Sequence, residues 1–292
     1  LACKSGNLEL CQWLFDNIPE EERIEAIKTE DNDQTPMAVA CKNGHLHVCQ
    51  WWYQKIYEEA LNKIKDKKPQ EAHAIAQENA RSEITEGDSF GNTPMYYASE
   101  SGNLEVCQWL VEVGANISIA SDLGKTTMML ACYSGNLKLC KWLYANGAAN
   151  DIVRSVEISG EMNSDGEMNS LTWSPMMEAC QNGYLDICEW LFEHMSTQQR
   201  VETFEEVYED GWTPMRIACE NGCLDICKWL IINVASIKDE NKIDLLTINT
   251  IVKQLDSKHK KAFSDEFKDL ETLFNKISSD LKQKSEKAKK ED

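Results

Sequence analysis

Apolar residues recur along most of the chain in a pattern typical of short helices arranged in pairs. An apolar stretch ends at a glycine, and a second apolar stretch follows directly. One second stretch contains Leu104, Val106–Cys107 and Trp109–Leu110. On a helix these residues form a broad apolar face. Thr or Ser followed by Pro opens most first stretches, which suits an N-cap and the first helical position. The pattern predicts helix–turn–helix units that bury their apolar faces only by stacking.

These units are copies of one motif. It reads Ala-Cys-x-x-Gly-x-Leu and continues as aliphatic-Cys-x-Trp-Leu, with a few substitutions. Its glycine recurs six times, at Gly6, Gly44, Gly102, Gly135, Gly183 and Gly222. Five copies open with Thr or Ser two residues before Met. The first copy lacks this opening because the chain starts at Leu1, inside the motif, so we expect the natural protein to begin earlier.

The motif resembles the ankyrin repeat family over residues 1–236. The shortest glycine spacing, from Gly102 to Gly135, is the 33-residue period of that family. Segments 88–94 and 121–126 are similar to its β-turn finger, and segment 113–116 to its closing Gly-Ala-Asn. The family's usual His after the helix opening is replaced, in order, by Ala38, Tyr96, Met129, Met177 and Arg216. The resemblance implies an all-α ankyrin repeat solenoid of about six repeats.

Two insertions and an extension accompany the expected array at 1–236. Residues 53–87 keep helical apolar spacing on both sides of Pro69, which predicts a helical hairpin. Residues 149–173 are polar, acidic and turn-rich, which predicts a loop. Residues 237–292 are expected to form a helical cap over the last repeat and a charged tail, with a docking helix as the alternative.

Charge narrows the class of partner. The formal net charge is −19, and an acidic surface repels phosphate backbones and anionic lipid heads. We therefore expect no nucleic acid and no membrane insertion, but protein partners with a basic surface. The chain shows no apolar leader and no stretch long enough to span a bilayer. Together with its cysteines, this favours an intracellular, reducing compartment, most simply the cytoplasm.

The positions of the 12 cysteines favour a role in core packing over metal binding or redox chemistry. Most recur in the motif, where the family holds small buried residues, and no Cys-x-x-Cys is present. Cys223, beside a turn, keeps a metal or redox site open as an alternative. Gly124–Thr127 imitates a phosphate-binding loop but lacks its first glycine. We predict no catalytic residue, no cofactor and no metal, and no enzyme activity.

Seven residues are candidates for partner binding because the resemblance implies binding through the fingers and the inner face of the short helices. Aromatic side chains in or beside the fingers are Phe90, Trp173 and Trp212. Residues that follow the first-helix core are Glu100, Tyr133, Gln181 and Glu220. Exposed aromatics there would be anchors, and acidic neighbours would suit a basic ligand. Local packing of the aromatic rings is the alternative.

The resulting functional prediction is a non-catalytic scaffold or adaptor that binds a protein through the concave face. Two alternatives stay open at this point. One is a fixed structural subunit of a large assembly, held by the insertions and the tail. The other is the regulatory part of a longer chain. Repeat architecture alone does not distinguish among them.

The repeated tryptophan gives the first test. It stands where the family holds a buried Leu, so we expect core packing. Trp109→Ala should lower the free energy of unfolding by about 3–5 kcal/mol, because it leaves a large cavity. Urea denaturation measures this, and an unchanged midpoint would contradict the packing interpretation.

Overall fold

The computed structural model describes residues 1–19, 22, 34–64, 67–162, 168–205, 212–237, 272, 276 and 279. The chain divides into two compact units, Leu1–Ile158 and Ser159–Asp292. The division falls inside the expected insertion at 149–173. The cap and tail expected at 237–292 lie outside the described residues, apart from Ile237 and three isolated positions.

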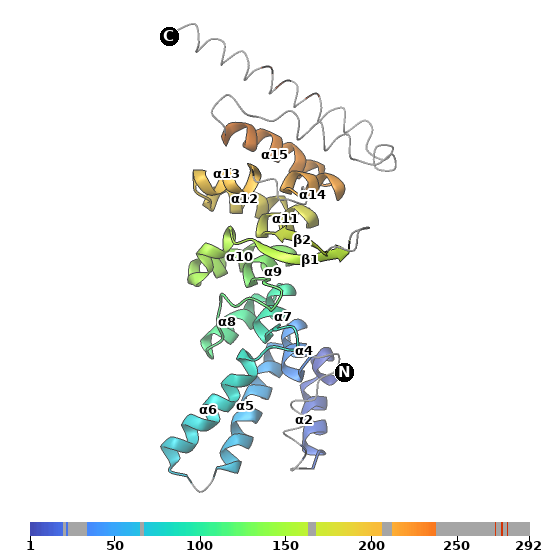
Figure 1. Cartoon of the computed structure of the whole chain (residues 1–292). Helices are drawn as coiled ribbons and strands as arrows, with labels where there is room; N and C mark the ends of the chain where they lie inside the picture. The colour runs from blue at the N-terminus through green and yellow to red at the C-terminus, as the bar shows by residue number, and fades with distance from the viewer. Residues whose placement is uncertain are drawn as a thin grey trace. The chain divides into compact units, whose positions relative to one another are not determined.

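The first unit is built from helix pairs in which a short first helix precedes a second helix (Figure 1). The first helices are α1 (Ala2–Ser5), α4 (Pro36–Lys42), α7 (Pro94–Glu100) and α9 (Thr127–Ser134). The second helices are α2 (Leu8–Asp16), α5 (Leu46–Lys63), α8 (Leu104–Glu112) and α10 (Leu137–Leu143). A further helix, α6 (Pro69–Thr85), follows α5, and two short turns, η2 (Tyr144–Ala148) and η3 (Ala149–Ile152), follow α10.

The second unit repeats this plan. Its first helices are α11 (Pro175–Asn182) and α14 (Pro214–Glu220), and its second helices are α12 (Leu185–His194) and α15 (Leu224–Ile237). Helix α13 (Thr197–Glu205) lies between the two pairs in sequence and packs on α14 and α15. Strand β1 (Val156–Met162), which begins before the boundary at Ile158, pairs with β2 (Met168–Trp173) in a two-stranded sheet.

The sheet corrects the expectation of a loop at 149–173. That segment begins with η3 and continues as the two paired strands. The sequence carries a signal for them, since Val156 and Ile158, like Leu171 and Trp173, alternate with polar residues. Such alternation is typical of a β-strand. The polar and acidic composition of the whole segment indicated a loop instead, so the alternation was overlooked.

Side-chain caps begin all the described first helices except α1, as the motif predicted. The hydroxyl oxygen accepts the backbone N–H of the residue three positions on at 3.1–3.3 Å for Thr35, Thr93, Thr126, Ser174 and Thr213. The donor is the residue that stands at the family's usual His position, so the cap survives without that His. At the other end, Gly135 adopts φ 76°, a left-handed conformation that favours glycine and closes α9.

The core lies between successive helix pairs. In the first unit α4 packs on α1 and α7, and α7 packs on α9; in the second unit α11 packs on α14. The largest fully buried side chains are those of Met, Leu and Ile, such as Met128 and Leu139. All cysteines are free thiols and are buried, except that Cys3 and Cys223 are half-buried. The motif cysteines therefore serve as small apolar core residues.

Side-chain amides and imidazoles tie successive pairs of the first unit together. Asn136 donates Nδ2–H to the carbonyl of Gly102 at 2.7 Å, and Asn103 donates to the carbonyls of Cys41 and Lys42. His45 makes the same kind of link from Nε2 to the carbonyl of Lys4 at 3.0 Å. Each donor follows the turn glycine of its own pair and reaches the turn of the preceding pair.

Helices α5 and α6 form an antiparallel hairpin that is anchored at its base. Ala72, Ala76 and Ala80 are buried at helical spacing, which lets the two helices approach closely. At the base Tyr53 packs edge-on against Trp109, with ring centroids 5.9 Å apart, and Arg81 donates to the carbonyl of Gly114 at 3.3 Å.

Burial of the repeated tryptophan varies along the chain. Trp109 and Trp190 are buried, as expected, and three others, Trp51, Trp142 and Trp229, are half-buried. Trp13 is 61% exposed, so the expectation of core packing is wrong for the first copy. The reason is geometric: no helix pair among the described residues precedes it.

The link between pairs can be measured with two matched asparagines. Asn136 caps α10 by accepting the N–H of Leu139 and also donates to Gly102. Among the described residues, the side chain of Asn7 makes only the corresponding cap, to Leu10 at 2.9 Å. Asn7→Ala should cost about 0.5–1 kcal/mol, and Asn136→Ala about 1 kcal/mol more, because it also loses the bond between pairs. Urea unfolding measures both. Equal costs would show that this bond adds nothing.

Candidate functional site

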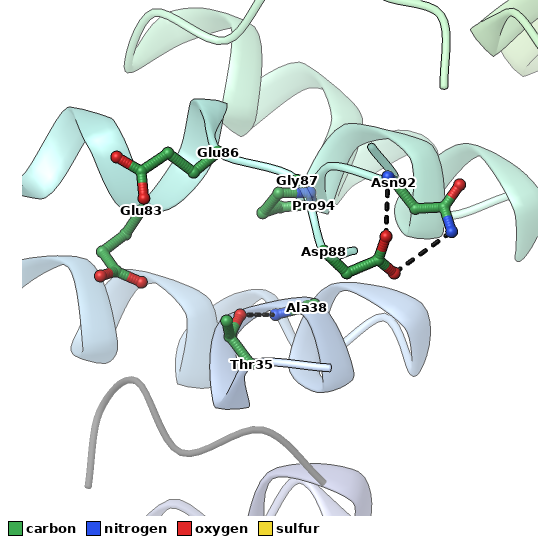
Figure 2. Close-up of a pocket in the computed structure, with 8 residues that line it drawn as sticks. All are labelled: Thr35, Ala38, Glu83, Glu86, Gly87, Asp88, Asn92 and Pro94. Atoms are coloured by element: carbon green, nitrogen blue, oxygen red, sulfur yellow. Dashed lines mark hydrogen bonds between the residues drawn. The ribbon is translucent and has the colours of Figure 1, made fainter. Parts of the chain in front are cut away.

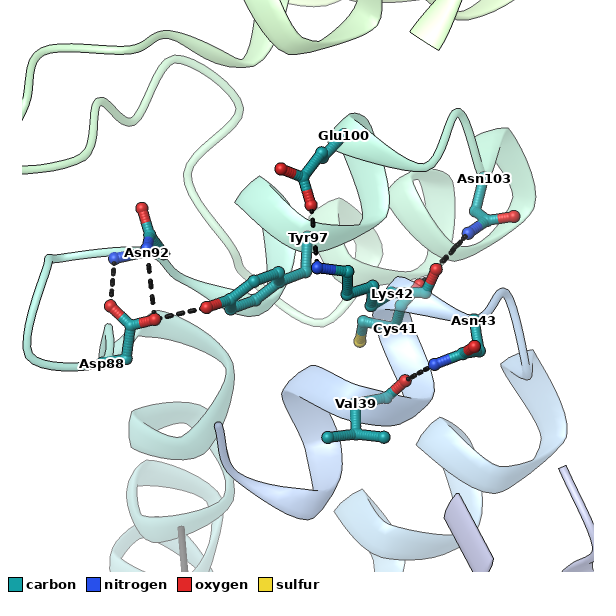
Figure 3. A network of polar contacts seen from close by, with 9 residues as sticks. All are labelled: Val39, Cys41, Lys42, Asn43, Asp88, Asn92, Tyr97, Glu100 and Asn103. Carbon is teal, nitrogen blue, oxygen red and sulfur yellow. Dashed lines mark hydrogen bonds and ion pairs between the residues drawn. The ribbon is translucent and has the colours of Figure 1, made fainter. Parts of the chain in front are cut away.

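A finger turn precedes α7, and its shape depends on one carboxylate. Oδ1 of Asp88 accepts the backbone N–H groups of Phe90 and Asn92 at 2.9 and 3.0 Å. Oδ2 accepts Nδ2–H of Asn92 at 3.2 Å and the hydroxyl of Tyr97, a buried residue of α7 (Figure 3). One side chain thus closes the turn and fastens it to the helix that follows.

These contacts shift two pKa values. Burial of the Asp88 carboxyl raises its pKa, but the hydrogen bonds from Tyr97, Asn92 and Phe90 outweigh burial, so the net pKa lies below its ordinary value. Burial, and then the bond to the carboxylate, raises the pKa of Tyr97 to about 12. At neutral pH the finger therefore contains a charged acceptor and a protonated phenol.

A second finger lies directly beside the first. Its residue Asp122 donates its backbone N–H to the carbonyl of Phe90 at 3.0 Å. Within it, Gly124 donates to Ser121 at 2.8 Å, and an isolated bridge pairs Ala120 with Thr126. The two fingers are hydrogen-bonded to each other through backbone atoms, which fixes their spacing.

The fingers expose two apolar side chains. Phe90 is 54% exposed and Leu123 is 50% exposed, and each lies three residues before the Thr that caps the next helix. Exposure of Phe90 agrees with its selection as a candidate. Leu123 was missed, because aliphatic residues were not considered in the fingers. Its place 33 residues after Phe90 is the signal that could have found it.

The first helices of the same unit contribute Glu100 and Tyr133, which occupy equivalent positions. Tyr133 is 45% exposed. Glu100 is half-buried and forms an ion pair with Lys42 at 3.2 Å, and the same ammonium lies 5.3 Å from the centre of the Tyr97 ring (Figure 3). The acidic charge expected to attract a basic ligand is therefore partly compensated within the protein.

The remaining candidates belong to the second unit. Trp173 ends β2 and is half-buried, and Gln181 is exposed on α11. Trp212 is half-buried, with the guanidinium of Arg216 4.3 Å from its ring centre, and Arg216 also pairs with Glu220 at 2.9 Å. Local packing, the alternative kept open from the sequence, thus applies in part to Trp212.

A small cavity lies beside the first finger, with a volume of about 100 Å³ (Figure 2). Its lining includes Thr35, Glu83, Glu86 and Asp88. Thr35 is engaged as a helix cap, Asp88 holds the finger, and the buried Glu83 also has a partner. The cavity is acidic and about the size of a few water molecules, and its lining contains no nucleophile with an adjacent base.

The thiols are arranged for packing. The two motif cysteines of one pair approach to 3.4 Å between Sγ atoms for Cys219 and Cys227, and to 3.6 Å for Cys41 and Cys49. Burial raises the pKa of Cys107 to about 12, and burial raises the pKa of Cys223 as well. Protonated thiols are poor nucleophiles and poor metal ligands. Among the described residues no group of three His, Cys, Asp or Glu side chains is placed to hold a metal ion.

Comparison with known proteins agrees with this architecture. The model of a family described as ankyrin repeats (3 copies) matches residues 1–120, 70–155 and 155–241. A search of curated proteins gave no match. Within the described residues, no helix has the length and apolarity needed to cross a bilayer. The family matches cover most of the chain, and the fold is all-α apart from the small sheet. The chain therefore belongs to the ankyrin repeat family.

Proposed function

We propose that the chain is a non-catalytic scaffold or adaptor whose first unit holds a protein partner through its two fingers and the adjoining ends of α7 and α9. Ankyrin repeats are generally protein–protein interaction modules. The observation that carries the proposal is the pair Phe90 and Leu123, two half-exposed apolar side chains on neighbouring, hydrogen-bonded fingers. Tyr133, near the C-terminal end of α9, adds an exposed aromatic side chain on a first helix of the same unit.

The fixed backbone beneath these side chains supports a role as anchors. Apolar side chains on mobile loops lose conformational freedom when they bind, which weakens the complex. Here Asp88 holds the first finger, and the backbone bond from Asp122 to Phe90 holds the second against it. A partner that buries Phe90 and Leu123 would therefore order little that is not already ordered.

The partner best suited to this surface offers apolar residues flanked by Lys or Arg. The chain's net charge of −19 attracts a basic surface over a distance. In the second finger Asp122 is exposed, and at the end of α7 Glu100 forms an ion pair with Lys42. We expect the charge to steer the partner toward the chain and the apolar pair to supply the affinity.

The buried free thiols support a reducing intracellular compartment such as the cytoplasm.

No observation on the hairpin favours the alternative of a fixed structural subunit. The large apolar side chains that are exposed among the described residues lie elsewhere, at Leu1, on α2, α9 and α15, and in the fingers. A permanent interface formed by α5 and α6 would need such side chains at its centre. The surface of the two fingers is the better-supported site.

The two anchors give a direct test. A photo-crosslinking residue replacing Phe90 or Leu123 in cells should capture the same partner at both positions, because the fingers are adjacent. The matched control is the same residue at Asn62, which is exposed on α5. Mass spectrometry of the adducts identifies the partner. Capture at position 62 but at neither finger would contradict the proposal.

Affinity for the captured partner supplies the second part of the test. Phe90→Ala with Leu123→Ala should weaken binding roughly tenfold or more, since central apolar anchors contribute over 1 kcal/mol each. Urea unfolding should show little change, because both side chains are half-exposed. Undiminished affinity in the double variant would contradict a role as anchors.

The contribution of Asp88 depends on pH. Because its pKa in the folded protein lies below the ordinary 3.8, its stabilisation is present above pH 3.8 and is lost as the pH falls through the folded value. Asp88→Asn should thus lower the free energy of unfolding by about 1–2 kcal/mol at pH 7 and by less near pH 3. Urea unfolding at both pH values measures this.

Asp122→Asn, on an exposed aspartate of the next finger, serves as the matched control. It should change stability little at either pH. A cost of Asp88→Asn that stays the same at pH 3 would show that the carboxylate charge does not hold the finger.

A further inference from the structure

A groove lies at the base of the hairpin, between α6 and the C-terminal end of α8, with a volume of about 390 Å³. Such a volume suits a ligand site, since these commonly enclose about 300–1,000 Å³. One wall is a single face of α6, because its residues stand three or four positions apart. They are Ala74, Gln77, Glu78 and Arg81. The other wall is formed by residues 112–114, at the end of α8 and in the turn after it.

Arg81 is the cation among the described residues of the lining, and it is already engaged. Its Nη2–H donates to the carbonyl of Gly114 at 3.3 Å. A Cβ at position 114 would stand 2.9 Å from Nε of Arg81, so the absence of a side chain there lets the guanidinium approach the backbone. Burial raises the pKa of Tyr53, and the charge of Arg81 opposes that rise. The guanidinium is therefore directed to the base of the hairpin.

Two carboxylates face the groove from opposite walls. Glu78 lies on α6 and Glu112 ends α8, and both are exposed. Neither forms an ion pair or a side-chain hydrogen bond with another residue that the structure describes. Glu78 stands one helical turn before Arg81, but Arg81 bonds to Gly114 instead. The groove thus presents two negative charges that are accessible and are not compensated by a neighbouring side chain.

The lining fits a cationic side chain with an apolar stem. Lysine and arginine carry their charge on such a stem and bury it along apolar surface. Ala74 and Val113 offer small apolar surfaces, one on each wall. A carboxylate accepts a guanidinium through two parallel hydrogen bonds, which favours arginine. An anion would instead meet two like charges and a guanidinium that is already bonded. The chain's net charge of −19 favours a cation at longer range as well.

We propose that this groove binds a basic side chain, preferably an arginine, from a short segment of a protein partner. The guanidinium lies between Glu78 and Glu112, and its stem lies over Ala74 and Val113. A protein is the favoured source because ankyrin repeats are generally protein–protein interaction modules. A polar groove for one segment also differs from a permanent interface, whose centre is apolar. The lining includes no finger residue, so the proposal does not rest on the function proposed for the fingers.

A pair of matched peptides tests the choice of ligand. One fluorescein-labelled peptide alternates alanine with arginine, and the other holds citrulline, a neutral analogue of the same shape, in place of each arginine. Fluorescence anisotropy with the full chain should show binding of the arginine peptide and at least tenfold weaker binding of the citrulline peptide. Equal affinity for the two peptides, or no binding of either, overturns the proposal.

Two double variants separate the groove from the overall charge. Glu78→Gln with Glu112→Gln should weaken binding of the arginine peptide at least tenfold. Glu9→Gln with Glu105→Gln removes the same charge from exposed positions of α2 and α8 outside the groove, and it should weaken binding less than twofold. Equal losses in the two double variants would show attraction by net charge alone and would overturn the groove as the site.

A groove-filling variant adds a test that leaves the charges in place. Ala74 is exposed, so Ala74→Trp should keep the urea midpoint while its ring occupies the groove. Binding of the arginine peptide should be lost, and undiminished binding would contradict the proposal.

A spermidine titration separates the two sources of a cation. The arginine peptide should bind more tightly than spermidine. Tighter binding of spermidine, lost in Glu78→Gln with Glu112→Gln, would assign the groove to a free polyamine and overturn the assignment to a protein.

Discussion

The contact between one helix pair and the next is the interaction on which each unit of this protein depends. A pair such as α7 with α8 has an apolar face too broad to enclose by itself, so Met95, Leu110 and their equivalents become buried only when pairs stack. The aromatic contacts and the amide links both run across this boundary. An insertion is tolerated when it leaves the contact between helix pairs intact. The hairpin of α5 and α6 is an insertion of this kind.

Stacking also determines where binding can occur. Each first helix is held in place by its neighbours, so the finger that precedes it is also held at its base. In the finger before α7, Asp88 accepts hydrogen bonds from Phe90 and Asn92 and so holds the rest of the turn. The small acidic cavity has no nucleophile–base pair in its lining, and the described residues include no group of three or more His, Cys, Asp or Glu that could hold a metal ion. The distinctive chemistry of the fingers is apolar area on ordered backbone, which suits recognition of another protein.

The features that were predictable from sequence are those decided locally or by the repeat. Thr93 caps a helix and Gly135 ends one, and both roles depend on the local sequence alone. The recurring cysteines indicate a core position that the repeats share. The pairing of Lys42 with Glu100 joins residues far apart in sequence, so composition alone suggested an uncompensated acid. Trp13 was misjudged for a related reason, because burial of a repeated residue depends on a neighbour that its own copy does not contain. The sheet at β1 and β2 was missed because composition was weighted above alternation.

The spread of free thiols through the core has a practical consequence. Nearly every described helix pair carries buried cysteines in its own interior, and burial keeps thiols such as Cys41 and Cys107 protonated. An alkylating reagent can modify such a thiol only after its helix pair opens to solvent. Almost every repeat of the chain therefore contains a native cysteine whose alkylation rate reports how often that repeat opens. Peptide-resolved alkylation rates would record the order in which the repeats open, without any label being introduced.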